Sequence, residues 1–145
     1  ILDINVKGLL YITRTVLPLM VARNQGHIIN IGSIAGKEVY PNGNVYCASK
    51  FAVDAVTKGM RLDLNKHGIK VTAIHPGLVE TEFSLVRFKG DEDRATNVYK
   101  GITPLTGNDI AEVILYTLSQ PKHVVLTDIT VLPLDQASAT VVNRH

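Results

Sequence analysis

The sequence predicts an α/β fold with a parallel sheet, and two observations support this prediction. Long segments with apolar residues at helical spacing alternate with short segments rich in Val, Ile and Leu. The first short segment, residues 27–31, is largely apolar and β-branched, which is typical of a strand covered on both faces. Helices and strands in strict alternation indicate an α/β protein.

Residues 1–22 are expected to form the first helix, because apolar residues recur along them at helical spacing. The apolar stripe is broad enough to predict that the helix buries two faces, with Pro18 bending its last turn. No capping residue precedes Ile1, so we expect that a longer polypeptide has lost its first part.

The remaining elements follow with glycine, proline and asparagine between them. Residues 44–66 should form a second long helix, capped by Asn42 or Asn44. The other expected elements are strands over 27–31, 69–74 and 123–132, a loop over 32–43, an irregular segment with short helices over 78–106, a helix from Asn108 or Asp109 to Leu118, and a tail from Pro133 onward.

Composition narrows the classes of function. The 145 residues are 46% hydrophobic and 19% charged, as in a globular domain, and the net charge is +2. Lys and Arg are scattered along the chain, so we expect no nucleic-acid partner. No apolar run reaches the ~18 residues that a membrane span needs, so we expect no membrane partner. Cys47 has no partner for an internal disulfide, which fits a cytoplasmic location. The histidines lack metal-ligand spacing, so no metal site is expected.

The most informative chemical pattern is Tyr46 with Lys50, four residues apart at the start of the second expected helix. This spacing places both side chains on one face. A phenol with a pKa of about 10 is a poor acid–base catalyst near neutrality, and a nearby ammonium should lower that pKa. The pair can therefore act as a general acid or base, although it also fits a half-buried tyrosine beside a solvated lysine.

Two further polar residues have both functional and structural interpretations. Ser33 follows a strand end, where the sites of parallel sheets gather, and its hydroxyl could hold a carbonyl oxygen or cap its own turn. Asn5 lies in the middle of the first expected helix, where asparagine is a mediocre helix former. Its side chain therefore either has a functional role or simply faces solvent. A hydrolase built on Ser33 and His75 would need an orienting acid that the sequence does not place, and no nucleophile-elbow motif surrounds Ser33.

Together these residues resemble the short-chain dehydrogenase/reductase family over essentially the whole chain. The matching segments are 5–8 (Asn-Val-Lys-Gly), 31–36 (Ile-Gly-Ser-Ile-Ala-Gly), 46–50 (Tyr-Cys-Ala-Ser-Lys) and 76–81 (Pro-Gly-Leu-Val-Glu-Thr). The resemblance implies a nicotinamide-dependent oxidoreductase in which Tyr46 is the catalytic acid/base. It implies further that Lys50 lowers the Tyr46 pKa and contacts the nicotinamide ribose, and that Ser33 positions the substrate carbonyl. Asn5 would hold a water that links Lys50 to solvent. The residues that would contact the cofactor are Pro76, Gly77, Val79 and Thr81.

The resemblance also implies the C-terminal part of a doubly wound, Rossmann-like domain with three α/β/α layers. Residues 1–145 are expected to be the C-terminal portion of one dinucleotide-binding catalytic domain, because the family's N-terminal glycine-rich turn is missing. The pyrophosphate binds at such a turn, so the isolated chain should bind the cofactor weakly or not at all. The two apolar helices, 1–22 and 44–66, are expected to pair in a homodimer or homotetramer, as the family commonly does.

A narrower resemblance concerns residues 81–91, 105–112 and 121–124, which look like the NADP-dependent 3-hydroxy acid dehydrogenases. It implies NADP as cofactor, with NAD not excluded, and a short 3-hydroxy acid or its semialdehyde as substrate. Arg87 is then expected to bind the substrate carboxylate, unless it belongs to an ordinary charged surface. The alternatives are a short-chain reductase of another carbonyl, such as a 3-oxoacyl thioester, and a non-catalytic fragment.

Overall fold

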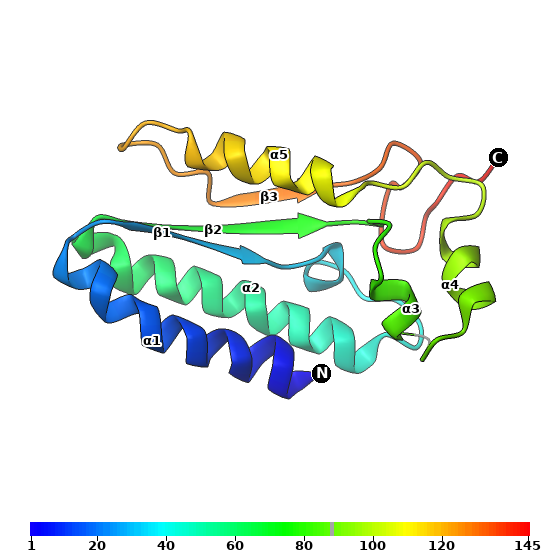
Figure 1. Cartoon of the computed structure of the whole chain (residues 1–145), viewed down its shortest axis with the longest axis horizontal. Helices are drawn as coiled ribbons and strands as arrows, with labels where there is room; N and C mark the ends of the chain where they lie inside the picture. Colours follow the sequence, from blue (N-terminus) through cyan, green and yellow to red (C-terminus); the bar gives the residue numbers. More distant parts are fainter. Residues whose placement is uncertain (88) are drawn as a thin grey trace.

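The computed structural model describes residues 1–87 and 89–145, and these form three layers with a sheet in the middle (Figure 1). The strands are β1 (Gly26–Ile31), β2 (Ile69–Pro76) and β3 (Asp128–Val131), in the order β1-β2-β3. Both pairings are parallel. Helices α1 and α2 cover one face and α5 the other (Figure 1). The predicted three-layer parallel α/β fold is therefore confirmed.

The helical elements lie close to the predicted ranges. Their bounds are η1 (Asp3–Gly8), α1 (Leu9–Ala22), η2 (Ile34–Gly36), α2 (Asn44–Leu64), η3 (Asn65–His67), α3 (Phe83–Arg87), α4 (Glu92–Tyr99) and α5 (Gly107–Leu118). The first expected helix begins as the π-helical η1 and continues as α1 through Pro18. The predicted cap of α2 is wrong, because the capping position is Gly43, which has no side chain to bond the first turn.

The central strand β2 explains why the last strand is shorter than predicted. All but one of the β2 residues are buried, because β1 and β3 flank the strand and α2 packs against it. β3 pairs only with the C-terminal half of β2, from Ala73 to Pro76. Residues 123–127 therefore lie outside the ladder, although the Thr127 carbonyl still accepts a hydrogen bond from the Ala73 amide at 3.0 Å. The tail after Pro133 contains no helix or named strand among the described residues, as expected.

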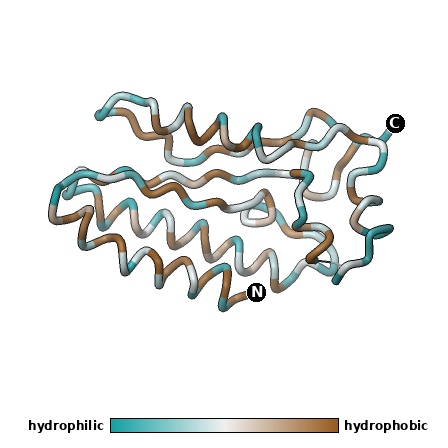
Figure 2. The backbone as a smooth tube through the Cα atoms, viewed as in Figure 1, coloured by the Kyte–Doolittle hydropathy of each residue, from teal (hydrophilic) through white to brown (hydrophobic). Residues whose placement is uncertain are grey.

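The first helix is much more exposed than predicted. No residue of η1 or α1 is buried, although Leu17, Met20 and Val21 pack partly against the core formed by Leu64, Ile69 and Val71. Figure 2 shows hydrophobic and hydrophilic stretches alternating along this helix. The prediction that the helix buries two faces is therefore wrong within the described residues.

The same helix also corrects the expectation about membrane-length segments. By length and composition alone, residues Asp3–Ala22 are apolar enough to cross a membrane. Apolar helices that pack against another protein surface satisfy the same criterion. Lys7 and Arg14 lie within the segment, and a cation near the centre of a span costs about 2.5–3.5 kcal/mol, which favours a protein surface as the environment.

Candidate active site

The C-terminal ends of β1 and β2 and the start of α2 enclose one side of a cavity of about 490 Å³. In parallel α/β sheets ligands bind at this end of the strands. The cavity brings together predicted residues from four segments of the chain. Those that line it are Ser33, Tyr46, Lys50, Pro76, Gly77, Val79, Thr81 and Arg87. Asn5 is the one predicted site residue that does not line this cavity.

Ser33 is placed by the turn that follows β1. It caps the short helix η2, and its Oγ accepts a hydrogen bond from the Ala35 amide at 3.1 Å. Its hydroxyl also lies close enough to the Tyr46 phenol to favour the phenolate form. The two interpretations of Ser33 are thus compatible, because one hydroxyl caps a turn and lies near the phenol that would exchange a proton.

Tyr46 and Lys50 lie one turn apart on α2, as the spacing predicts. The Lys50 Nζ is 5.9 Å from the centre of the Tyr46 ring and donates a hydrogen bond to the Ile31 carbonyl at 3.2 Å. Burial raises the pKa of Tyr46 above its ordinary value, and the nearby Ser33 hydroxyl opposes this rise only in part. Burial lowers the pKa of Lys50.

The expected net lowering of the Tyr46 pKa by Lys50 is therefore not found. Burial disfavours the phenolate more strongly than the surrounding groups favour it. A phenol with a raised pKa keeps its proton at neutral pH, and this is the form that can donate a proton to a carbonyl oxygen.

Asn5 contacts α2, the helix that contains Tyr46 and Lys50, without reaching the cavity. Its Nδ2 donates to the Ser49 Oγ at 3.1 Å, and the Ser49 hydroxyl donates to the Tyr46 carbonyl at 2.7 Å. Asn5 lies in the π-helical turn η1, a type of turn that is frequent at functional sites. The sequence reasoning missed Ser49, and the predicted water between Asn5 and Lys50 stays a prediction.

Arg87, at the end of α3, lines the same cavity as Ser33. Its guanidinium carbon is 5.6 Å from the centre of the Tyr40 ring, and its N–H groups donate to the Tyr40 hydroxyl. The Arg87 charge also opposes the rise in the Tyr46 pKa. Arg87 therefore places a positive charge within electrostatic reach of the proposed acid, and Tyr40, which the sequence reasoning missed, supports it. Phe88, in the same resemblance segment, lies outside the described residues.

Two side chains from distant parts of the chain hold the segment that follows β2. The Tyr99 hydroxyl donates to the Val79 carbonyl at 2.9 Å. Gln136 accepts a hydrogen bond from the Leu78 amide at 2.8 Å and is itself buried. Sequence reasoning could not find either residue, because neither lies in a motif and each meets the loop only through the fold.

A cluster of two buried side chains and one exposed carboxylate was also missed. Asp54, His75 and Asp128 have ligand atoms within 4.8 Å of one another, although three different elements supply them. The orienting acids that the hydrolase alternative lacked are therefore present. His75, however, directs its Nδ1 at the backbone oxygen of Ser33, at 3.2 Å. A hydrolase would require that nitrogen to face the Ser33 hydroxyl.

Comparisons with known proteins identify the family of this chain. The family profile of the short chain dehydrogenases matches residues 1–91. The chain is similar to the NADP-dependent 3-hydroxy acid dehydrogenase of Schizosaccharomyces pombe, with 48% identity over 97% of this chain and 54% of the relative. The enzyme of that name from Escherichia coli K12 is 47% identical, over 95% of this chain and 56% of its own.

Solved structures show the same relationship. The closed form of a serine dehydrogenase complexed with NADP+ superimposes with a TM-score of 0.91 and 46% identity, covering 97% of this chain and 57% of that one. The serine dehydrogenase from Escherichia coli gives a TM-score of 0.74 and 39% identity, over 92% and 51% of the two chains. The chain thus spans about half the length of the relatives that it matches.

Proposed function

This chain belongs to the short chain dehydrogenase family, and from that premise we propose that it is the C-terminal portion of the catalytic domain of an NADP-dependent dehydrogenase of short 3-hydroxy acids. The observation that carries this proposal is the convergence of Ser33, Tyr46 and Lys50 on one cavity with the Pro76–Thr81 segment. The names of the relatives support the cofactor and the class of substrate.

The residues present fit one part of a nicotinamide cofactor. The cavity opens at the C-terminal ends of the strands, and Pro76, Gly77, Val79 and Thr81 form one wall of it. Lys50, on the facing helix, is the nearby cation that would contact the ribose. Bound NADP would supply the acceptor for the hydride that leaves the hydroxyl-bearing carbon.

The proton of the reacting hydroxyl is handled by residues of this chain. In the oxidation, the Tyr46 phenolate takes the hydroxyl proton, and in the reverse reduction the protonated phenol returns it to the carbonyl oxygen. Ser33, which lines the same cavity as that phenol, orients the same oxygen. Because burial raises the Tyr46 pKa, the reduction should retain its rate to higher pH, whereas the oxidation should need alkaline pH.

The test is an assay with a protein that carries the whole domain containing this sequence. NADPH formation is followed by absorbance with serine, with 3-hydroxypropionate and with an uncharged alcohol as substrates. Oxidation of the two acids with NADP+ supports the proposal. Reduction of 3-oxoacyl thioesters without oxidation of either acid would favour the alternative function, a short-chain reductase of another carbonyl substrate.

We also propose that Arg87 binds the substrate carboxylate. A planar guanidinium can bind both carboxylate oxygens at once. Arg87 lines the same cavity as Ser33 and Tyr46, and the Tyr40 ring lies beside its guanidinium. A carboxylate at Arg87 would leave the hydroxyl end of a short substrate directed towards the two catalytic side chains.

Arg87→Met should lower kcat/KM for the 3-hydroxy acids and leave the uncharged alcohol nearly unaffected. The loss of one hydrogen bond to a charged group costs about 1.5–3 kcal/mol, or about 10- to 150-fold in kcat/KM. The matched control is Lys89→Met, which removes a charge two residues further along the chain. Equal losses for acid and alcohol would show that Arg87 shapes the cavity and does not bind the carboxylate.

We propose further that η1 and α1, which together make up the helix expected over residues 1–22, form with α2 the interface of a homodimer or homotetramer. Both helices expose large apolar side chains on the described surface, and such patches usually mark association. Those with the greatest exposure are Ile4 at 78%, Tyr11 at 67%, Ile12 at 69%, Leu19 at 70% and Leu62 at 82%.

Leu62→Glu should shift the protein towards monomers, because each copy of an isologous interface would bury a new charge. The mass in solution is measured by light scattering at micromolar concentration. Leu134→Glu, at a fully exposed position of the tail, is the matched control and should keep the mass of the unmodified protein. A monomeric unmodified protein would contradict the proposed interface.

A further inference from the structure

His75 occupies a fully buried position immediately before the Pro76–Gly77 turn, at the end of β2. Its ring lies directly against Gly32, where an added Cβ would collide with the ring Nδ1. Glycine at position 32 is therefore what makes room for the ring beneath the turn that carries Ser33. The proposed mechanism gives this histidine no role.

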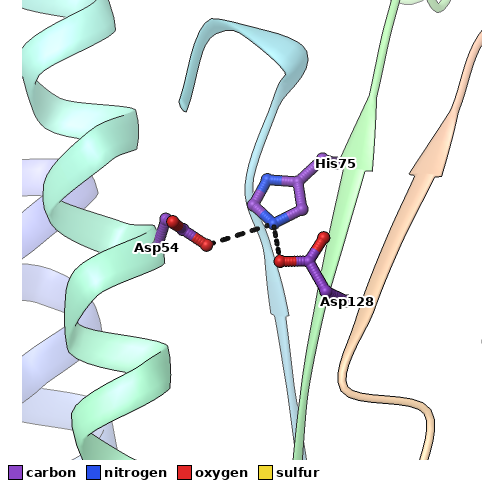
Figure 3. Close-up of side chains that lie close together, drawn as sticks. All are labelled: Asp54, His75 and Asp128. Atoms are coloured by element: carbon purple, nitrogen blue, oxygen red, sulfur yellow. Dashed lines mark ion pairs between the residues drawn. The ribbon is translucent and has the colours of Figure 1, made fainter. Parts of the chain in front are cut away.

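Acceptor atoms surround both nitrogens of the His75 ring. Nδ1 is 3.2 Å from the Ser33 carbonyl oxygen, which can only accept, so Nδ1 must carry a proton. Nε2 lies 3.5 Å from the Asp54 Oδ1 and 3.6 Å from the Asp128 Oδ2 (Figure 3). Among the described residues, Nε2 has no hydrogen-bond partner. The Ser33 carbonyl thus fixes a proton on Nδ1, and the charges around the ring decide whether Nε2 carries a second proton.

Lys37 supplies the charge that balances the two carboxylates. Its Nζ is 2.9 Å from the Asp54 Oδ1 and 2.5 Å from the Asp128 Oδ2, the two oxygens that face His75. Lys58 adds a second ammonium, 2.7 Å from the Asp54 Oδ2. Two carboxylates and two ammonium groups are balanced when the ring is neutral. Burial and the Lys37 charge favour this neutral ring, because both hold the His75 pKa below its ordinary value.

The same side chains could be taken for a metal site. Two carboxylates and one imidazole nitrogen are ligands that transition metals accept. The Lys37 ammonium, however, already contacts both carboxylates at hydrogen-bonding distance. A divalent ion would have to displace this tethered cation, so the observations favour a structural network over a metal site.

We propose that His75 is a positioning residue, whose Nδ1–H holds the Ser33 carbonyl and so aims the Ser33 hydroxyl at the substrate oxygen. The inference rests on the proposed function, because Ser33 acts there on the reacting oxygen. The Gly36 amide donates to the same carbonyl at 2.8 Å, which leaves the Ser33 backbone held by two donors. Asp54 follows Tyr46 and Lys50 at four-residue spacing on α2, so the cluster also couples α2 to the turn that carries Ser33.

Two substitutions separate the roles of the ring nitrogens. His75→Gln places an amide near the position of Nε2 and removes the donor to Ser33, whereas His75→Asn places an amide near Nδ1 and can keep that donor. Misplacement of a catalytic group can cost up to about 100-fold. We expect H75Q to lose about 10- to 100-fold in kcat with little change in the KM for NADP, and H75N to recover most of that loss.

The matched control is His123→Gln, which makes the same change at an exposed histidine and should keep the kcat of the unmodified protein. Thermal unfolding of each variant shows whether it folds. Equal kcat losses in H75Q and H75N, with both variants folded, would overturn the inference, because a structural role alone does not distinguish the two nitrogens.

The protonation state of His75 can also be tested on the unmodified protein, without a substitution and without an activity assay. The 15N shifts of the His75 ring should show a protonated Nδ1 and a bare Nε2, and they should not change when Zn2+ is added. A proton on Nε2, or a Zn2+-dependent shift of that nitrogen, would overturn the inference. Absence of activity towards 3-hydroxy acids would instead contradict the proposed function, and the ring shifts would still decide the state of His75.

Discussion

Tyr46→Phe is expected to remove nearly all turnover in a protein that carries the whole domain, by about 10²–10⁴-fold in kcat. The substitution deletes one oxygen, the atom that would exchange a proton with the substrate. The affinity for NADP should stay close to that of the unmodified protein, because the ring remains to pack against Phe83, whose ring centre is 5.7 Å away.

The experiment compares kcat with the dissociation constant for NADP measured by calorimetry. Tyr116→Phe makes the same change at an exposed position of α5 and is the matched control. Near-normal kcat in Tyr46→Phe would mean that another group is the acid, and it would remove the central element of the proposed mechanism.

Lys50→Ala is expected to impair both turnover and cofactor binding, in contrast to Tyr46→Phe. Loss of a charged hydrogen bond to the cofactor should cost about 1.5–3 kcal/mol, or about 10- to 150-fold in the dissociation constant for NADP. Turnover should fall as well, because the cation that would stabilise a phenolate at Tyr46 is removed. The substitution also leaves the Ile31 carbonyl without its Lys50 donor.

Lys66→Ala, at an exposed site just after α2, serves as the control for loss of a lysine. Calorimetry with NADP and steady-state kinetics on the same samples separate the two effects. If Lys50→Ala bound NADP as tightly as the unmodified protein, the assignment of Lys50 to the ribose would be wrong, and only its electrostatic role would remain.

Local rules account for what the sequence by itself determined. Apolar periodicity placed the two long helices and the first two strands, because side-chain direction repeats with the backbone geometry. The four-residue spacing of Tyr46 and Lys50 placed them on one face of α2 for the same reason. The motif segments also indicated the residues that line the cavity, because parallel strands bring their C-terminal ends to one edge of the sheet.

Only the tertiary structure decided the energetics of the site. The direction of the Tyr46 pKa shift depends on burial, which the spacing to Lys50 does not reveal. The length of β3 was set by its pairing with β2, and the exposure of α1 by what packs against it. The cluster of Asp54, His75 and Asp128 joins a helix and two strands that are separated along the chain. Such a cluster forms only when packing brings distant elements together, so no local pattern in the sequence could predict it.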